Sequence, residues 1–127
     1  MSEKPKVLYV CTPDHTRRVF RPGKFEELLE RFDVTWRDSD QPWTTEEMTQ
    51  QVSGMDAVVT GWGAPATCEE FFQRADRLKI IAHSAGSVRH LIPDELDNRY
   101  CLPRCIVVFS ANAAIACNVA EATVGML

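Results

Sequence analysis

The run Leu-Lys-Ile-Ile-Ala-His-Ser-Ala-Gly-Ser-Val, residues 78–88, decides the fold. Its first part, residues 78–82, is a short apolar run that is typical of a buried strand. Small residues then follow from Ser84 to Ser87, and small side chains leave backbone N–H groups uncovered. Ligands of open α/β sheets bind outside the carboxyl ends of the strands. The stretch therefore predicts a core strand and a binding loop, with a plain strand-to-helix turn as the alternative.

Four more apolar runs predict strands, at residues 7–11, 33–37, 57–60 and 106–109. Between them lie segments with helical spacing of apolar residues or helix-start signals. They fall near residues 25–32, from Thr44 or Thr45 onward, 68–75, 93–99 and 113–127. Strands and helices thus alternate five times, which predicts a parallel sheet with right-handed crossovers. The expected fold class is α/β, a flavodoxin-like three-layer sandwich with a five-stranded parallel sheet.

The length of 127 residues fits one domain with a core of its own. The net charge of -4 gives no electrostatic footprint for nucleic acid, and no apolar run reaches the roughly 18 residues of a membrane span. The five cysteines are odd in number and form no CxxC pair, which favours a reducing, cytoplasmic compartment. The spacing of cysteines and histidines predicts no metal site.

Several polar residues follow the first predicted strand. Thr12, Pro13, Asp14 and His15 are expected to form a solvated turn, with an acid/base pair of Asp14 and His15 as the less favoured alternative. Cys11 is expected to be a small buried residue rather than a nucleophile. For two further groups we expect structural roles. Arg17, Arg18 and Arg21 are expected to form a solvated face, with binding of an anionic ligand or of a partner's acidic surface as the alternative. Cys101 and Cys105 are expected to take part in loop and strand packing.

Nucleotide-binding fingerprints are absent from this sequence. No GxGxxG follows a strand and no P-loop occurs. Gly61 and Gly63 form a GxG, but Ala66 stands where the last glycine should be and Pro65 interrupts the helix start. A receiver domain would need an aspartate at Thr60. The sequence carries no complete catalytic set.

From residue 78 onward the sequence resembles the D-isomer-specific 2-hydroxy acid dehydrogenases. Residues 83–89, His-Ser-Ala-Gly-Ser-Val-Arg, resemble the substrate loop in one branch of that family. Residues 60–65, Thr-Gly-Trp-Gly-Ala-Pro, are similar to the loop after the third strand in the same branch. Residues 119–121, Val-Ala-Glu, resemble the start of the interdomain helix. The order and spacing of these pieces match over about residues 58–127.

The resemblance implies that residues 1–127 form the substrate-binding domain of such an enzyme, with an interdomain helix beginning near residue 113. Backbone N–H groups of Gly86, Ser87 and Val88 would bind the substrate carboxylate, with Ala85 in place of a commoner glycine. Trp62 and Gly63 would form a wall of the same cleft. Ile115 departs from the family, many of whose members carry a substrate-facing asparagine there.

The resemblance also implies what this chain lacks. The family's dinucleotide fingerprint, arginine, carboxylate and acid/base histidine would follow residue 127, so no catalytic or cofactor-binding residue is expected here. We expect NAD or NADP to be bound by a separate nucleotide-binding domain, a small 2-hydroxy or 2-oxo acid as substrate, and a homodimeric parent enzyme. Leu127 falls within a predicted apolar helix, so we expect the polypeptide to continue and the fragment alone to be inactive. One alternative is a standalone flavodoxin-like module that binds small carboxylates or pairs with a partner chain carrying the nucleotide-binding domain. Another is self-association through residues 113–127.

Overall fold

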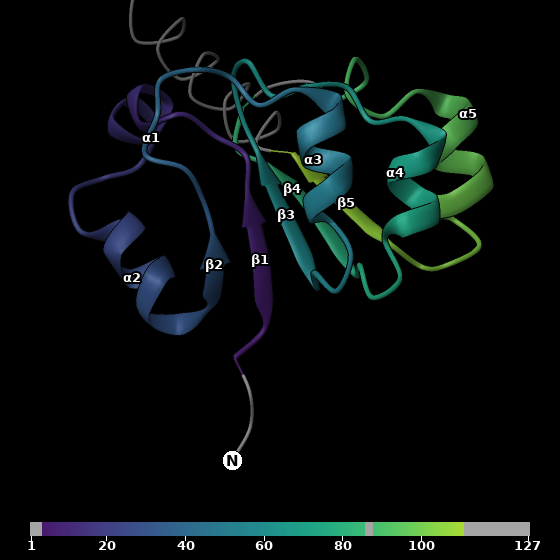
Figure 1. Ribbon diagram of the computed structural model, residues 1–127, viewed down its shortest axis with the longest axis horizontal. Coiled ribbons are helices and arrows are strands. Elements are labelled where there is room, and N and C mark those ends of the chain that lie inside the picture. Colours follow the sequence, from purple (N-terminus) through teal and green to yellow (C-terminus); the bar gives the residue numbers. More distant parts are fainter. Residues whose placement is uncertain (1–3, 86–87, 111–127) are drawn as a thin grey trace, which may run out of the picture.

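Five parallel strands form one sheet in the order β2-β1-β3-β4-β5 in the computed structural model (Figure 1). The structure describes residues 4–85 and 88–110. This strand order, with connecting helices, is the flavodoxin-like arrangement, so the predicted fold class is confirmed. The elements are β1 Lys6–Tyr9, α1 Pro13–Val19, α2 Lys24–Arg31, β2 Asp33–Thr35, α3 Thr45–Gln51, β3 Ala57–Thr60, α4 Glu69–Arg74, β4 Ile80–His83, α5 Asp94–Leu96, the π-helical segment η1 Asp97–Cys101 and β5 Val107–Ser110.

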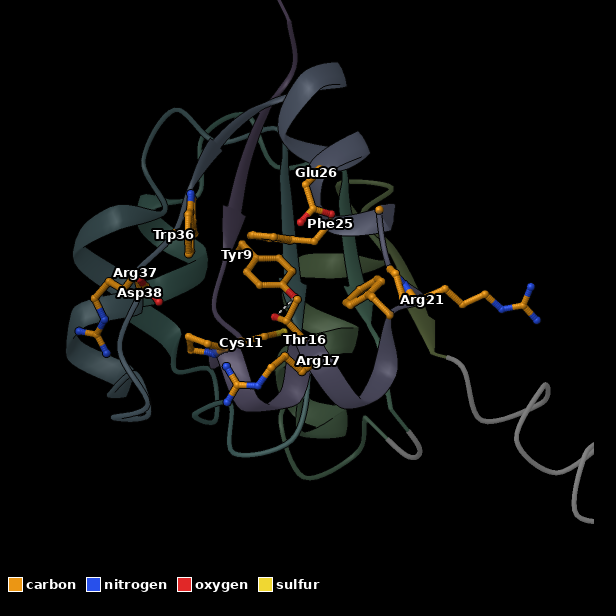
Figure 2. Close-up of a pocket in the computed structure, with 14 residues that line it drawn as sticks. Tyr9, Cys11, Thr16, Arg17, Arg21, Phe25, Glu26, Trp36, Arg37 and Asp38 are labelled. Atoms are coloured by element: carbon orange, nitrogen blue, oxygen red, sulfur yellow. Dashed lines mark hydrogen bonds between the residues drawn. The ribbon is translucent and has the colours of Figure 1, made fainter.

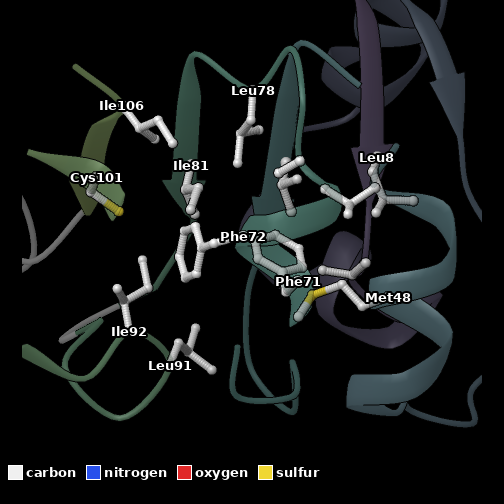
Figure 3. Packing of buried hydrophobic residues seen from close by; sticks show 14 of the residues in the cluster. Leu8, Met48, Phe71, Phe72, Leu78, Ile81, Leu91, Ile92, Cys101 and Ile106 are labelled. Carbon is white, nitrogen blue, oxygen red and sulfur yellow. The ribbon is translucent and has the colours of Figure 1, made fainter. Parts of the chain in front are cut away.

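The register aligns one row of apolar side chains across each face of the sheet. Leu8, Val58, Ile81 and Val108 are neighbours in successive strands and point to one face. The first three are fully buried, because α3 and α4 pack Met48, Phe71 and Phe72 against them (Figure 3). This face carries the main core.

The opposite face is covered unevenly. Tyr9, Val59, Ala82 and Phe109 occupy the next position of the register. Tyr9 is buried beneath α1 and α2, whereas Phe109 at the far end of the row is 56% exposed. Figure 1 shows α1 and α2 beside β1 and β2 on this side, and α3, α4 and α5 on the other.

Helix α3 begins where the sequence predicts a helix start. The Thr44 hydroxyl accepts a hydrogen bond from the Glu47 backbone N–H, and the Glu47 carboxylate accepts one from the Thr44 N–H, both at 3.1 Å. This reciprocal capping box satisfies two N–H groups that no helical carbonyl can reach.

Helix α1 lies where the sequence predicted a solvated turn. The Thr12 hydroxyl caps the helix by accepting from the His15 N–H, and Pro13 occupies the first helical turn. Pro13 therefore starts a helix instead of only ending a strand, because proline lacks the N–H that a first turn leaves unpaired.

The predicted strands and the remaining described helices match within a few residues. The segment at residues 93–99 forms as α5 and η1, which together reach Cys101. Cys101 is buried as expected, but Cys105 is exposed with a φ of 56°, so the packing role predicted for Cys105 is wrong. The helix predicted at residues 113–127 lies outside the described residues.

Candidate functional site

The candidate site lies at the carboxyl edge of the sheet, where β1, β3 and β4 end. Because the strands are parallel, the loops that follow them meet at this edge. His15 of α1 contacts both of the other loops: its Nε2 lies 2.9 Å from the Ser84 hydroxyl, and its Nδ1 accepts from the Trp62 backbone N–H at 3.3 Å. His15 is only 2% exposed. One buried imidazole thus holds the loops after β3 and β4 side by side.

The hydrogen bonds of this cluster determine the tautomer of His15. Because the Trp62 N–H donates to Nδ1, that nitrogen carries no proton and Nε2 carries one. Nε2–H therefore donates to Ser84, and the Ser84 hydroxyl in turn donates to the Thr60 carbonyl at 2.7 Å. His15 cannot take a proton from Ser84 in this arrangement, so the pair positions loops and is not a nucleophile–base pair.

The environment keeps the groups of this edge uncharged. Burial lowers the pKa of His15, and the nearby Asp14 carboxylate opposes that effect only in part. Burial also raises the pKa of the Cys11 thiol to about 11. Cys11 lies 3.9 Å from the Ser84 hydroxyl as a neutral thiol, in keeping with the expected buried cysteine.

Gly61 is required by its contact with His15. A Cβ added at Gly61 would lie 2.2 Å from His15 Nε2 and less than 3.0 Å from two ring carbons. The imidazole therefore packs directly on the glycine backbone. The Gly-Trp-Gly motif thus has a packing reason that the sequence did not reveal.

Trp62 and Gly63 form a tight turn beside the imidazole. The Ala64 N–H donates to the Gly61 carbonyl at 3.1 Å, and Gly63 has a φ of 78°, as the third residue of a type II turn requires. The Trp62 indole meets the His15 ring edge-on at a centroid distance of 5.0 Å and is 56% exposed. An exposed aromatic ring at this edge could form the wall of a cleft.

The predicted substrate loop is described at its two ends only. Ser84 N–H donates to the Thr60 carbonyl at 2.7 Å, so this amide is used within the domain. Ala85 is buried, and Val88 packs partly against the core while its carbonyl accepts from the N–H groups of Leu91 and Ile92. Gly86 and Ser87 lie outside the described residues, so their predicted role stays a prediction.

The interpretation of Asp14 and His15 needs correction. His15 does not lie in a solvated turn, and its imidazole is hydrogen-bonded to Trp62 and Ser84, not to Asp14. Asp14 instead pairs at the surface with Arg18 at 3.2 Å and Arg17 at 3.8 Å. Successive helical residues point in different directions, so one turn of α1 directs one side chain outward and the next inward. The prediction of a turn overlooked this difference in direction between successive residues of a helix.

His83 is a second buried histidine near this edge. Its Nδ1 lies 2.8 Å from the Thr60 hydroxyl, and its ring meets that of His90 edge-on at 5.9 Å. Burial lowers the pKa of His83, and the neighbouring His90 and His15 lower it further. Among the residues that the structure describes, no three histidine, cysteine or acidic side chains are grouped to hold a metal ion.

Acid should destabilise this protein through His15 and His83. The pKa values of both histidines are lower in the folded chain than the ordinary histidine pKa of about 6.5. As the pH falls below about 6.5, the unfolded chain therefore takes up protons that the folded chain does not yet bind. The free energy of unfolding should therefore be constant above about pH 7.5. It should fall by up to about 1.4 kcal/mol per pH unit per histidine from pH 6.5 down to the folded pKa values.

Urea unfolding between pH 8 and pH 5 measures this effect above the range where exposed carboxylates titrate. The variant His15→Gln should lose part of the pH dependence, because glutamine cannot take up the proton. A free energy of unfolding that stays level from pH 7.5 to pH 5 would contradict the assignment of both histidines as neutral.

The strand order and the βα connections place the chain in the class of flavodoxin-like α/β domains. Two solved structures share this fold with the chain. The PH0520 protein from Pyrococcus horikoshii OT3 is 24% identical, with a TM-score of 0.65 over 96% of this chain and 32% of that one. A protein from Polaromonas sp. JS6 66, described as a D-isomer specific 2-hydroxyacid dehydrogenase, NAD-binding, is 20% identical, with a TM-score of 0.59 over 84% of this chain and 30% of that one.

The chain therefore spans about a third of the length of each of these two structures. At these identities the likeness establishes the fold. No known family profile matches the sequence, and no curated protein does. Across residues 4–85 and 88–110, no helix is long and apolar enough to span a membrane.

Proposed function

We propose that this chain is the substrate-binding domain of an NAD(P)-dependent D-2-hydroxy acid dehydrogenase, which reduces a 2-oxo acid or catalyses the reverse reaction. The observation that carries the proposal is the junction of two loops at the carboxyl edge of the sheet. These are the loops with the family-like sequences, and His15 links them through Trp62 N–H and the Ser84 hydroxyl. The fold shared with a D-isomer specific 2-hydroxyacid dehydrogenase supports the same proposal.

The proposed role of the loop after β4 is to bind the substrate carboxylate through backbone N–H groups. Aligned N–H donors favour an anion, and small side chains allow it to approach closely. The residues proposed are Ala85, Gly86, Ser87 and Val88. Trp62 would cover the substrate from the side, since its exposed indole stands next to this loop through its contact with His15.

The described residues do not fit a dinucleotide. A dinucleotide site needs a glycine-rich turn between the first strand and a helix, where backbone and pyrophosphate approach closely. Here the turn after β1 carries Cys11, Thr12 and Pro13, and the Thr12 side chain occupies the start of α1. We therefore propose that the nicotinamide cofactor is held by a separate domain. This chain would bind the acid and leave NADH unoxidised when it is assayed alone.

Titration of the 127-residue chain with glyoxylate or hydroxypyruvate tests the proposal by backbone amide chemical shifts. We expect saturable shifts at millimolar ligand for Ala85, Val88 and the Trp62 indole N–H, because a carboxylate bound by two or three N–H groups polarises each of them. The uncharged glycolamide is the control ligand and should cause no saturable shift.

Two exposed tryptophans provide a matched pair of variants for this titration. Trp62→Leu should weaken glyoxylate binding several-fold, whereas Trp36→Leu, which changes a 38% exposed tryptophan after β2, should leave it unchanged. Unshifted amides around residues 85–88 at 20 mM ligand would refute the substrate-binding role. A nucleotide-binding domain encoded downstream of residue 127 would support the proposed domain arrangement.

A standalone small-carboxylate-binding module is the second candidate, because the same edge could bind an anion without any chemistry. The two candidates differ in what a partner domain adds. Cofactor-dependent reduction of a 2-oxo acid after addition of the nucleotide-binding domain supports the dehydrogenase. If the chain binds carboxylates but no reduction of a 2-oxo acid follows when the nucleotide-binding domain is added, the result supports the binding module.

A further inference from the structure

A separate cavity of about 350 Å³ lies between α1, α2 and the segment that follows β2 (Figure 2). It borders the candidate site at Cys11, which lines the cavity and also lies 3.9 Å from the Ser84 hydroxyl. Thr16 and Arg17 of α1 line the cavity together with Phe20, which follows the helix, whereas His15 does not. Trp62 and Ser84 are not among the lining residues either. The proposed function therefore makes no use of this cavity.

The cavity has aromatic walls. The ring of Phe25 lies 5.0 Å from that of Tyr9 and 5.0 Å from that of Trp36, which it meets edge-on at 83°. Phe20 extends the series at 6.3 Å from Tyr9. Tyr9 is buried and Trp36 is 38% exposed, so the series runs from the floor of the cavity to its mouth. Such surfaces favour a flat apolar group, which can add a further offset or edge-on contact.

The floor of the cavity is uncharged and internally hydrogen-bonded. The Thr16 hydroxyl donates to the Thr12 carbonyl at 3.1 Å, so the Tyr9 hydroxyl, 2.6 Å away, donates to Thr16. Burial raises the pKa of Tyr9 and that of the neighbouring Cys11. A ligand group at the floor therefore meets neutral, apolar surroundings.

Charged side chains gather at the mouth instead. Arg17 is held only by a 3.8 Å contact with Asp14 and is 67% exposed. Arg21 has no ion pair with any residue that the structure describes, and Figure 2 shows its side chain extended away from the aromatic rings. Arg37 is already engaged by Glu47 and by the ring of Trp43, 4.4 Å away. Figure 2 shows the side chains of Arg17 and Arg21 extending to opposite sides of the cavity, so each offers its own guanidinium group to an anion at the mouth.

We propose that this cavity binds a small aromatic carboxylate, with its ring packed against Phe25 and Trp36 and its carboxylate paired with Arg17 or Arg21. The guanidinium fork matches a carboxylate in geometry and charge. A volume of about 350 Å³ is at the lower end of the range for ligand pockets, about 300–1,000 Å³, which selects a single or fused double ring. Glu26 and Asp38 also line the mouth, so an ammonium group on the same ligand would find a partner.

Calorimetric titration of the 127-residue chain with 3-phenylpropionate tests the proposal. We expect saturable binding with a Kd of about 1 mM, as the binding energy per atom of small ligands suggests. The chemical shift of the Trp36 indole N–H should change with the same Kd. The uncharged 3-phenylpropionamide should bind at least tenfold more weakly, because it cannot pair with the arginines. L-phenylalanine, compared with 3-phenylpropionate, determines whether an ammonium group adds affinity.

The double variant Arg17→Gln/Arg21→Gln should weaken 3-phenylpropionate binding about tenfold. Arg31→Gln is its control, since Arg31 lies on α2 outside the cavity and pairs with Glu27 at 2.9 Å. Trp36→Leu should also weaken this binding, whereas Trp62→Leu should not, which is the reverse of the pattern expected for glyoxylate. Absence of heat and of shifts at 10 mM, equal binding of the amide, or full affinity in the double variant would each overturn the proposal.

Discussion

Alanine in place of Gly61 should lower the free energy of unfolding by about 2–3 kcal/mol, the upper part of the range for overpacking in a buried site. The added Cβ would lie 2.2 Å from His15 Nε2, and that ring is held from two sides by Trp62 N–H and the Ser84 hydroxyl. The imidazole cannot move without breaking one of these hydrogen bonds. Urea unfolding of both proteins measures the difference.

A double-mutant cycle separates this contact from other effects of the substitution. Gly61 does not have a positive φ, so alanine fits its backbone once the ring is removed. In a His15→Ala background, Gly61→Ala should cost less than about 0.5 kcal/mol, and the coupling energy should be about 2 kcal/mol. Gly63→Ala is the control: its φ of 78° predicts a cost of about 1 kcal/mol that His15→Ala leaves unchanged. An equal cost of Gly61→Ala in both backgrounds would rule out the contact as its cause.

Phe72→Ala should have the largest effect on stability, about 3–5 kcal/mol, as for other fully buried phenylalanines. Its ring is completely buried, stacks on Tyr100 at 5.5 Å and meets Phe71 edge-on at 5.0 Å. Removing it leaves a cavity where α4 meets η1. Because domains of this size are stable by only about 5–15 kcal/mol, the variant should be close to unfolding at 37 °C.

Phe109→Ala is the matched control, because it removes the same ring from a strand that exposes it. Phe109 is 56% exposed, so its replacement should cost at most about 1 kcal/mol. Thermal unfolding followed by circular dichroism measures both variants. A similar loss for the two would mean that the face of β5 is covered in solution, and the assignment of the core to one side of the sheet would be wrong.

The effect of Gly61→Ala reaches the proposed function as well. His15 joins the loops after β3 and β4, so a displaced imidazole should separate Trp62 from the loop that begins at Ser84. Loss of glyoxylate binding in a folded Gly61→Ala protein would therefore agree with a cleft built by both loops. Binding of 3-phenylpropionate should persist in the same protein, because neither Gly61 nor His15 is among the residues that line the second cavity.

The sequence alone determined the sheet and its order of elements. Residues 57–60 form β3 as expected, because a short β-branched run that ends at glycine has few other stable conformations in a buried position. Thr44 and Glu47 determined the start of α3 in the same way, since both partners of a capping box lie within one helical turn. Local physics was sufficient at these places.

The tertiary structure alone decided the environment of His15. Its contacts, Gly61, Trp62 and Ser84, lie 46, 47 and 69 positions further along the chain, and no local pattern connects them. Parallel strands bring their carboxyl ends to one edge, and only then does an inward-facing residue of α1 meet two distant loops. The burial of His15, its tautomer and its lowered pKa all follow from these contacts. The same residue in an isolated helix would be an ordinary solvated histidine, because the groups that change it belong to other strands.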